Sequence, residues 1–410
     1  MSRPISTLPE SPKLDVESIR KSFPVLSRTI GGQPIVYLDS AATYLTPQVV
    51  IDSVTDSYRS LAGSVGRGVH LMVEESSERY AAARQTIADF IRAESDEVIF
   101  VRNATEAINL VAAGLPSDAI IVGSVGEHHS NLLPWRTRHQ LTQVAIDDSG
   151  SVDLDSLELA VKDKQPSLIA ISTIGNAIGA INDVNEIVKI ARRYGADVLL
   201  DASQSAAHHC IDVGQLDCDY LCFSGHKLGG PSGIGVLYGK REKLERLAPL
   251  LVGGGAVEDV SETDFQFSEI PHRFESGTPA VEAAIGLAAV CDFLESIGLD
   301  AIQAHENKLT ERLIEELSSV PRVNLVGPCD ASRRGPIVTF HVDGLEAHGA
   351  ARMLSSRRNI CVRSGFHCAQ PAHISNGWRP TLRASFGVYN TEQEVETLTE
   401  SLRSITENLF

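Results

Sequence analysis

The feature that most constrains the fold is a regular alternation of short apolar runs with amphipathic segments. Linking strands through helices brings the strands side by side in parallel and covers both faces of the sheet. The sequence therefore predicts an α/β fold with a mainly parallel sheet. The strand-like runs are DEVIFV (96–101), AIIVGS (119–124), PSLIAIST (166–173) and ADVLLDAS (196–203), and helical segments include ATEAINLVAAGL (104–115) and VNEIVKIARRYG (184–195).

The C-terminal part has a pattern of its own. VTFHVD (338–343) and ICVRSG (360–365) are typical of strands in a smaller sheet, and residues 345–359 and 391–409 have helical periodicity. Thr391 and Glu394 have the spacing of a capping box, which predicts a helix start. We expect three parts, which are an N-terminal arm (1–30) packing with the small domain, a large domain (31–296) and a small C-terminal α+β domain (297–410).

Net charge and hydropathy narrow the choice of partners and location. The formal net charge of −17 argues against a nucleic-acid surface. No apolar stretch is long enough to span a bilayer, so no membrane partner is expected. The polar first residues lack the apolar core of a signal peptide, which predicts a cytoplasmic location.

The cysteines predict neither a disulfide framework nor a zinc ribbon. Their number, seven, is odd, and no two are spaced as C-x-x-C, so no metal site is expected. We expect most of them, Cys361 included, to be buried thiols used as small apolar residues. Cys368 lies in a predicted loop, which sets it apart.

Polar side chains follow several predicted strands, where ligands of open α/β sheets bind. The strongest case is Lys227, which follows the apolar run before SGHK. The others are Asn103, Ala104 and Thr105 at a helix start, the pair His128 and His129, Asn176, Asp201, Gln204, Ser224 and His226.

These residues are the parts that pyridoxal phosphate requires. A lysine bonds to the cofactor aldehyde, a carboxylate pairs with the pyridine nitrogen, a flat side chain stacks on the ring, and a helix start with hydroxyls holds the phosphate. Each part taken singly has a plain structural role, such as a solvated Lys227 or a helix-capping Asp201. Their joint order along the chain favours the cofactor site.

The order and wording of these segments resemble fold-type I pyridoxal-phosphate enzymes of aminotransferase class V, and within them the group II (SUF-type) cysteine desulfurases and selenocysteine lyases. The resemblance runs from residue 23 to residue 395, and its most specific strings are SGHKLGGPSGIGVLYGK (224–240) and HRFESGTP (272–279). It implies a large domain with a mainly parallel seven-stranded sheet that binds the cofactor. It also implies a Schiff base at Lys227, with Asp201 on the pyridine nitrogen, Gln204 on the ring's phenolic oxygen, His128 stacked on the ring, and Ala104, Thr105, Ser224 and His226 on the phosphate.

The resemblance also implies a sulfur-transfer reaction in a homodimer with shared active sites. Thr278 would reach the phosphate of the partner subunit. Cys368 would take sulfur from L-cysteine as a persulfide, release alanine and pass the sulfur to an acceptor protein, with His367 and Arg363 favouring its thiolate. Arg383 would pair with the substrate carboxylate, which Arg363 also approaches, and Asn176 would orient the substrate or the cofactor's phenolic oxygen.

Four positions depart from the pattern of the resembling family. Gly66 and Phe366 replace histidines, Gly175 replaces a serine, and Gly229 replaces a tyrosine. These changes lie where substrate and partner are expected, so other reactions stay open. The alternatives are a C–S lyase, an epimerase or another amino-acid-transforming enzyme of a biosynthetic pathway, and a non-enzymatic scaffold for a sulfur carrier.

Overall fold

The computed structural model describes residues 14–61, 64–66 and 68–409. Its centre is a seven-stranded sheet in the order β4–β10–β9–β8–β7–β5–β6. Strand β10 is antiparallel to both of its neighbours, and the other pairs are parallel. The predicted mainly parallel seven-stranded sheet is therefore confirmed. The strands are β4 (Val98–Val101), β5 (Ile120–Ser124), β6 (Gln140–Val144), β7 (Leu168–Ser172), β8 (Asp197–Asp201), β9 (Tyr220–Ser224) and β10 (Gly235–Gly239).

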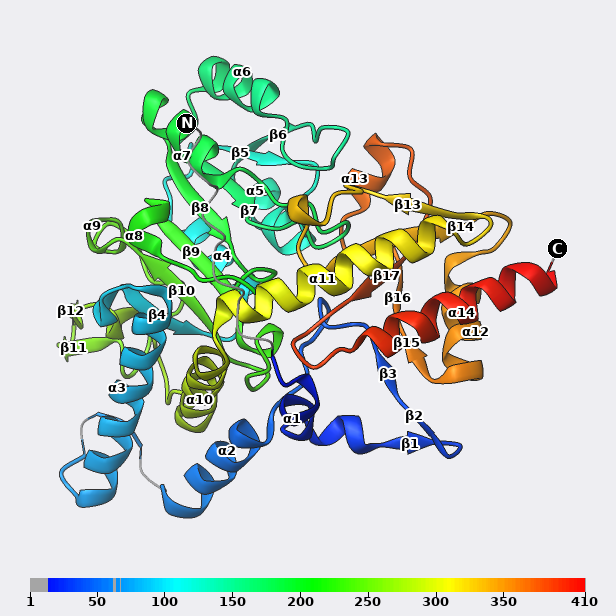
Figure 1. Ribbon diagram of the computed structural model, residues 1–410. Helices are drawn as coiled ribbons and strands as arrows, with labels where there is room; N and C mark the ends of the chain where they lie inside the picture. Colours follow the sequence, from blue (N-terminus) through cyan, green and yellow to red (C-terminus); the bar gives the residue numbers. More distant parts are fainter. Residues whose placement is uncertain (1–13, 62–63, 67, 410) are drawn as a thin grey trace, which may run out of the picture.

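Helices cover both faces of this sheet (Figure 1). Because side chains alternate along a strand, Leu199 and Leu200 of β8 belong to two different apolar cores. One core includes residues of α3 (Leu71–Ile91), α6 (Leu154–Lys164), α7 (Val184–Tyr194) and α10 (Val281–Ile297). The other includes residues of α4 (Ala104–Gly114) and α5 (Leu133–Arg138). The helix α2 (Gln48–Ser60) packs on α10.

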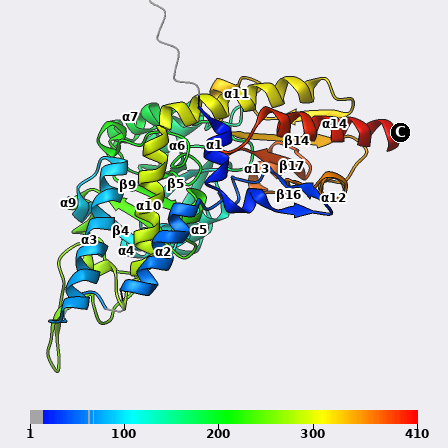
Figure 2. The ribbon, with the colours of Figure 1, turned by 60° about the horizontal axis from the view of Figure 1, so that its bottom comes forward.

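The C-terminal part forms a second sheet beside the first (Figure 2). Its order is β13–β14–β17–β16, with all pairs antiparallel. Thr391 and Glu394 exchange backbone-to-side-chain hydrogen bonds, which confirms the predicted capping box. The elements are α11 (Leu299–Ser318), β13 (Val323–Val326), β14 (Ile337–Val342), α12 (Ala347–Arg358), β16 (Arg363–Gly365), α13 (Gln370–Ser375), β17 (Thr381–Ser385) and α14 (Glu392–Leu409).

The single strand predicted for ICVRSG is wrong, because the segment divides in two. Only β16 joins the four-stranded sheet, whereas β15 (Ile360–Cys361) pairs in parallel with β3 (Val36–Tyr37) near the start of the chain. Val36 and Leu38 pack in the core of the C-terminal sheet. This pairing joins segments more than 300 residues apart, which no local pattern reports.

The described part of the N-terminal arm contacts the C-terminal region. Arg20 of α1 (Val16–Lys21) donates hydrogen bonds to the Tyr389 carbonyl and to Glu394. Residues 1–13 of the predicted arm lie outside the described residues, and the three domain boundaries stay predictions. Within the described residues, no helix combines the length and apolar character needed to cross a membrane.

Candidate active site

One cavity of about 330 Å³ lies where the strands of the central sheet end. Every predicted site residue except His129 and Thr278 lines it. The contributions come from the ends of β8 and β9, from the start of α4, from the turns after β5 and β7, and from the C-terminal sheet. The polar residues that were far apart in the sequence are thus brought together, as the strand-end rule predicts.

Lys227 ends the short 3-10 turn (Gly225–Lys227) that follows β9. Its side-chain amine forms no salt bridge or hydrogen bond within the described residues. Burial lowers the pKa of its amine below the usual value, and the nearby Asp201 carboxylate partly offsets this shift. A buried amine without an ion-pair partner favours its neutral form, which is the nucleophilic one.

Asp201 is the last residue of β8 and is buried. One of its carboxylate oxygens accepts a hydrogen bond from the Ser203 N–H at 2.9 Å. Gln204, three residues later, donates from its side-chain amide to the Ala41 carbonyl at 2.9 Å. The second Asp201 oxygen accepts no hydrogen bond from the described residues, so it remains available to a ligand in the cavity.

The loop after β5 places His128 against the cavity and Glu127 behind it. His128 Nδ1 accepts a hydrogen bond from the Ser130 N–H at 3.0 Å, and burial with the Lys227 charge lowers its pKa to about 4. The ring is therefore neutral near pH 7. Glu127 is fully buried and accepts hydrogen bonds from the Ser172 N–H, the Ser172 hydroxyl and the Asn131 amide.

The start of α4 collects the groups predicted to hold a phosphate. Asn103 caps the helix by accepting from the Glu106 N–H, and the Ala104 N–H donates to the Ser224 hydroxyl at 3.0 Å. Thr105 and His226 also line the cavity. An eleven-residue helix whose N-terminus meets several hydroxyls is suited to an anion.

Two arginines from neighbouring strands reach the cavity. Arg383 of β17 lies opposite Arg363 of β16. Arg383 is buried and donates to the Asn176 carbonyl at 2.6 Å, so it is no surface cation. Arg363 is half exposed and pairs with Asp39 at 2.9 Å, while Arg383 lies 3.6 Å from the same carboxylate.

Cys368 is exposed at the cavity and is held in an unusual backbone conformation. His367 and Cys368 have φ angles of 52° and 57°, in the left-handed region that costs energy for residues other than glycine. Two tethers fix this turn. The His129 N–H donates to the Cys368 carbonyl at 2.9 Å, and the Asn176 amide donates to the His367 carbonyl at 2.6 Å.

Two expectations about cysteine chemistry are wrong. Burial lowers the pKa of His367 to about 2, so its ring is neutral and supplies no positive charge to the Cys368 thiolate. The only other predicted cation there is Arg363. Most cysteines are also not buried, since only Cys218, Cys222 and Cys291 are, and Cys361 is partly exposed.

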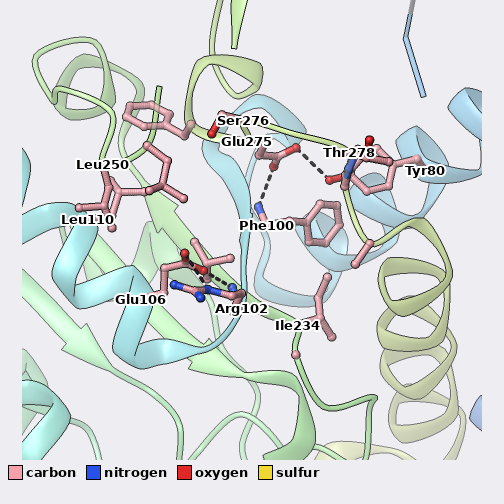
Figure 3. Close-up of a pocket in the computed structure, with 16 residues that line it drawn as sticks. Tyr80, Phe100, Arg102, Glu106, Leu110, Ile234, Leu250, Glu275, Ser276 and Thr278 are labelled. Carbon is pink, nitrogen blue, oxygen red and sulfur yellow. Dashed lines mark hydrogen bonds and ion pairs between the residues drawn. The ribbon is translucent and has the colours of Figure 1, made fainter. Parts of the chain in front are cut away.

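Thr278 lies outside this cavity and lines a different one of about 320 Å³ (Figure 3). Its side chain is exposed and makes no hydrogen bond within the described residues. In a single chain, Thr278 is therefore not part of the site that holds Lys227.

Three buried polar atoms at the main cavity have no hydrogen-bond partner within the described residues. They are Asn176 Oδ1, Arg383 Nε and His367 Nδ1. Because such atoms cost free energy when left unpaired, they indicate a polar ligand. The helix start, the buried Asp201 and the unpaired Lys227 amine fit pyridoxal phosphate, and Arg383 fits a substrate carboxylate. Among the described residues, no three His, Cys, Asp or Glu side chains are grouped to hold a metal ion.

Sequence reasoning missed Glu127 and Asp39, which support the site from behind. Both were visible as letters, in GEHHSN next to His128 and in YLDSAAT. Their roles depend on burial and on contacts with distant residues, which the local sequence does not reveal. At Gly229, φ is 96° and an added Cβ would lie 2.7 Å from the Leu45 carbonyl, so the tyrosine expected there does not fit this backbone.

A comparison with known protein families shows which family the chain belongs to. The family model described as aminotransferase class-V matches residues 36–398. The chain belongs to the aminotransferase class-V family. Within it, a probable cysteine desulfurase from Halalkalibacterium halodurans is 41% identical over 96% of this chain and 98% of the relative. Another from Streptomyces coelicolor is 40% identical over 96% of this chain and 97% of the relative.

Solved structures of similar proteins have the same fold. A cysteine desulfurase from Thermococcus onnurineus superposes with a TM-score of 0.90 at 39% identity, covering 96% of this chain and 98% of the other. The cysteine desulfurase CsdA from Escherichia coli gives a TM-score of 0.87 at 32% identity, over 96% and 99%. The predicted fold class and family resemblance are confirmed.

Proposed function

We propose that this chain is a pyridoxal-phosphate-dependent cysteine desulfurase that converts L-cysteine to L-alanine and carries the sulfur on Cys368. The observation that carries the proposal is one cavity holding the Lys227 amine, the Asp201 carboxylate and the exposed Cys368 thiol. The relatives named cysteine desulfurase, similar over nearly the whole chain, support it. The group II subtype and a cytoplasmic location remain predictions from the sequence.

The bound cofactor would supply an electron sink for charge left on the substrate's Cα. With the cofactor bound, Asp201 would keep the ring nitrogen protonated, and Lys227 would move the proton at Cα. The lowered pKa of Lys227 favours the neutral amine that proton removal needs. Arg383 binds the substrate carboxylate, because its pKa of about 10 keeps it charged near pH 7. The other residues would hold the cofactor and substrate: His128 on the ring face, Gln204 on the phenolic oxygen, Ala104, Thr105, Ser224 and His226 on the phosphate, and Asn176 and Arg363 near the substrate.

Cys368 receives the sulfur. Its thiolate attacks the substrate sulfur, the Cβ–S bond breaks as the S–S bond forms, and Cβ gains a proton to give alanine. The two tethers on the 367–368 backbone hold the thiol at the cavity rather than on a free loop. A persulfide held this way requires an acceptor, proposed to be a protein, that comes to the cavity mouth.

The active form is proposed to be a homodimer in which Thr278 completes the cofactor site of the other subunit. Residues 64–66, Gly68 and residues 277–279 line a common cavity of about 570 Å³. Close to them in sequence, Tyr58, Val69 and Leu71 are 69%, 94% and 67% exposed. Large exposed apolar side chains support an interface with a second copy here.

The test uses purified protein with pyridoxal phosphate, L-cysteine and a reductant. We expect alanine and sulfide in equal amounts and, without reductant, a Cys368 peptide heavier by one sulfur atom. Cys368→Ala should abolish both, whereas Cys329→Ala, which changes an exposed cysteine outside the cavity, should change neither. Unchanged alanine formation in Cys368→Ala would remove Cys368 from the reaction.

Other products would point to the alternatives. Pyruvate and ammonia in place of alanine indicate a C–S lyase, and recovery of the D-enantiomer of an amino acid indicates an epimerase. Protein that binds pyridoxal phosphate but turns over no amino acid in a substrate screen indicates a scaffold.

A further inference from the structure

Glu275, three residues before Thr278, has the most completely bonded carboxylate around the second cavity. Its side chain is 6% exposed. Oε1 accepts from Arg84 Nη1 and from the Phe100 N–H, both at 2.7 Å, and Oε2 accepts from Arg84 Nη2 at 2.7 Å and from the Tyr80 hydroxyl at 2.9 Å. Figure 3 shows dashed lines from the Glu275 carboxylate to Phe100 and to Tyr80, with Thr278 close by.

Arg84, the cation of this pair, is itself fixed. It belongs to α3, is 5% exposed and donates to the Val98 carbonyl at 2.7 Å. Its guanidinium carbon lies 5.1 Å from the centre of the Tyr80 ring and 4.6 Å from that of Phe100. A buried ion pair adds little net stability over apolar residues of similar size, so its clearest use is to select one geometry.

The geometry selected is that of the segment 275–279. Glu275 holds one end of it, and the Gly277 N–H donates to the Gly254 carbonyl at 2.7 Å, in a turn where Gly277 has φ of 88°. Between these anchors and α10, Thr278 remains exposed. The Phe100 N–H that binds Glu275 belongs to β4, the strand that leads into Ala104 and the phosphate end of the main cavity.

We propose that the Arg84–Glu275 pair positions Thr278 for the cofactor site of the partner subunit. The pair ties the segment that serves the partner to the strand that enters the subunit's own site. Glu275 is thus a positioning residue that acts across the interface, and this inference rests on the proposed shared site of the homodimer.

The test is a set of mixed dimers in which only one subunit keeps Lys227. In the first, Lys227→Ala is on one subunit and Glu275→Gln on the other, so the intact site is served by an unchanged Thr278 segment. In the second, one subunit carries both substitutions and the other is unchanged, so the intact site is served by a loosened segment. We expect pyridoxal phosphate to dissociate from the intact site roughly tenfold faster in the second dimer only.

Two further variants separate positioning from general damage. Tyr80→Phe removes one donor to Glu275 and should act in the same direction with a smaller effect. Asp219→Asn is the matched control, because Asp219 is also buried and accepts from an arginine and a backbone N–H. Asp219 directly precedes β9, at the opposite end of that strand from the main cavity. This substitution should leave cofactor dissociation equal in both dimers.

The inference would be overturned if pyridoxal phosphate dissociated faster to the same extent in both mixed dimers, or faster in neither. Thr278→Val in the same two arrangements distinguishes its failure from that of the shared site. An effect of Thr278→Val across the interface without one of Glu275→Gln refutes the positioning role alone. No effect of Thr278→Val refutes the shared site and the inference with it.

Discussion

The central sheet has an amino edge, where its parallel strands begin, and a carboxyl edge, where they end. The two edges differ in how their buried ionisable groups are paired. At the amino edge, Asp219 accepts from Arg192 and from the Val198 N–H, both at 2.8 Å, with Lys240 and Lys243 within 4.0 Å. At the carboxyl edge, Lys227 has no ion pair within the described residues.

The difference shows which edge keeps buried polar atoms unpaired, at a cost in stability, for the sake of function. A buried polar atom without a partner costs about 1–3 kcal/mol, and the carboxyl edge keeps such atoms on Asn176 and Arg383. The amino edge has its charges paired and contributes stability. Substitutions at the carboxyl edge should therefore change activity, and those at the amino edge should change the free energy of unfolding.

The largest effect is expected for Lys227→Ala. Without the amine, the rate of alanine formation should fall by about 10⁴-fold or more, and the visible absorbance of bound cofactor should be lost. The free energy of unfolding of the cofactor-free protein should not fall, because a buried amine without an ion pair is removed. Denaturant titration measures it. A stability loss comparable to that of an amino-edge substitution would contradict the contrast.

Arg383→Met should reduce kcat/KM for L-cysteine by roughly 10²–10³-fold, because it removes the cation proposed to bind the carboxylate. The free energy of unfolding should fall by less than in Asp219→Asn, because Arg363 still pairs with Asp39 once Arg383 and its bond to the Asn176 carbonyl are lost. Initial rates over a range of L-cysteine concentrations test the first expectation and denaturant titration the second. The control is Arg334→Met, because Arg334 is a buried arginine outside the cavity and its loss should leave kcat/KM unchanged.

Asp219→Asn is the opposite case. Breaking its buried pair with Arg192 should lower the free energy of unfolding by about 3 kcal/mol, as measured in urea. The value of kcat/KM under native conditions should stay within about threefold, because Asp219 is at the far edge of the sheet from the cavity. A large loss of activity with little loss of stability would mean that the two edges are not separate in function.

The sequence was sufficient for those residues of the carboxyl edge that directly follow an apolar strand. Asp201, Ser224 and Lys227 could be placed at strand ends from local pattern alone. The structure was needed wherever a role depends on distant partners. The pairing of β3 with β15, the loss of charge on His367 by burial, and the position of Thr278 outside its own chain's cavity are all of this kind.

Glu127 shows how burial at the carboxyl edge differs from burial at the amino edge. Asp219 has cationic partners, whereas Glu127 accepts only from the neutral Ser172 and Asn131 within the described residues. Burial, the largest cause, raises the pKa of Glu127 to about 7, and Asp201 adds to the shift. In the unfolded chain the pKa of a glutamate is about 4.3.

The smallest predicted effect follows from this raised pKa. Between these two pKa values the folded state binds more protons than the unfolded state, so this carboxyl group makes the free energy of unfolding fall as pH rises. From pH 5 to pH 7 its contribution should fall by about 2 kcal/mol. Glu127→Gln should remove that part of the slope, which urea titrations of both proteins at several pH values would measure. Parallel curves for the two proteins would mean that Glu127 is ionised throughout this range, and that the carboxyl edge stabilises an anion as the amino edge does.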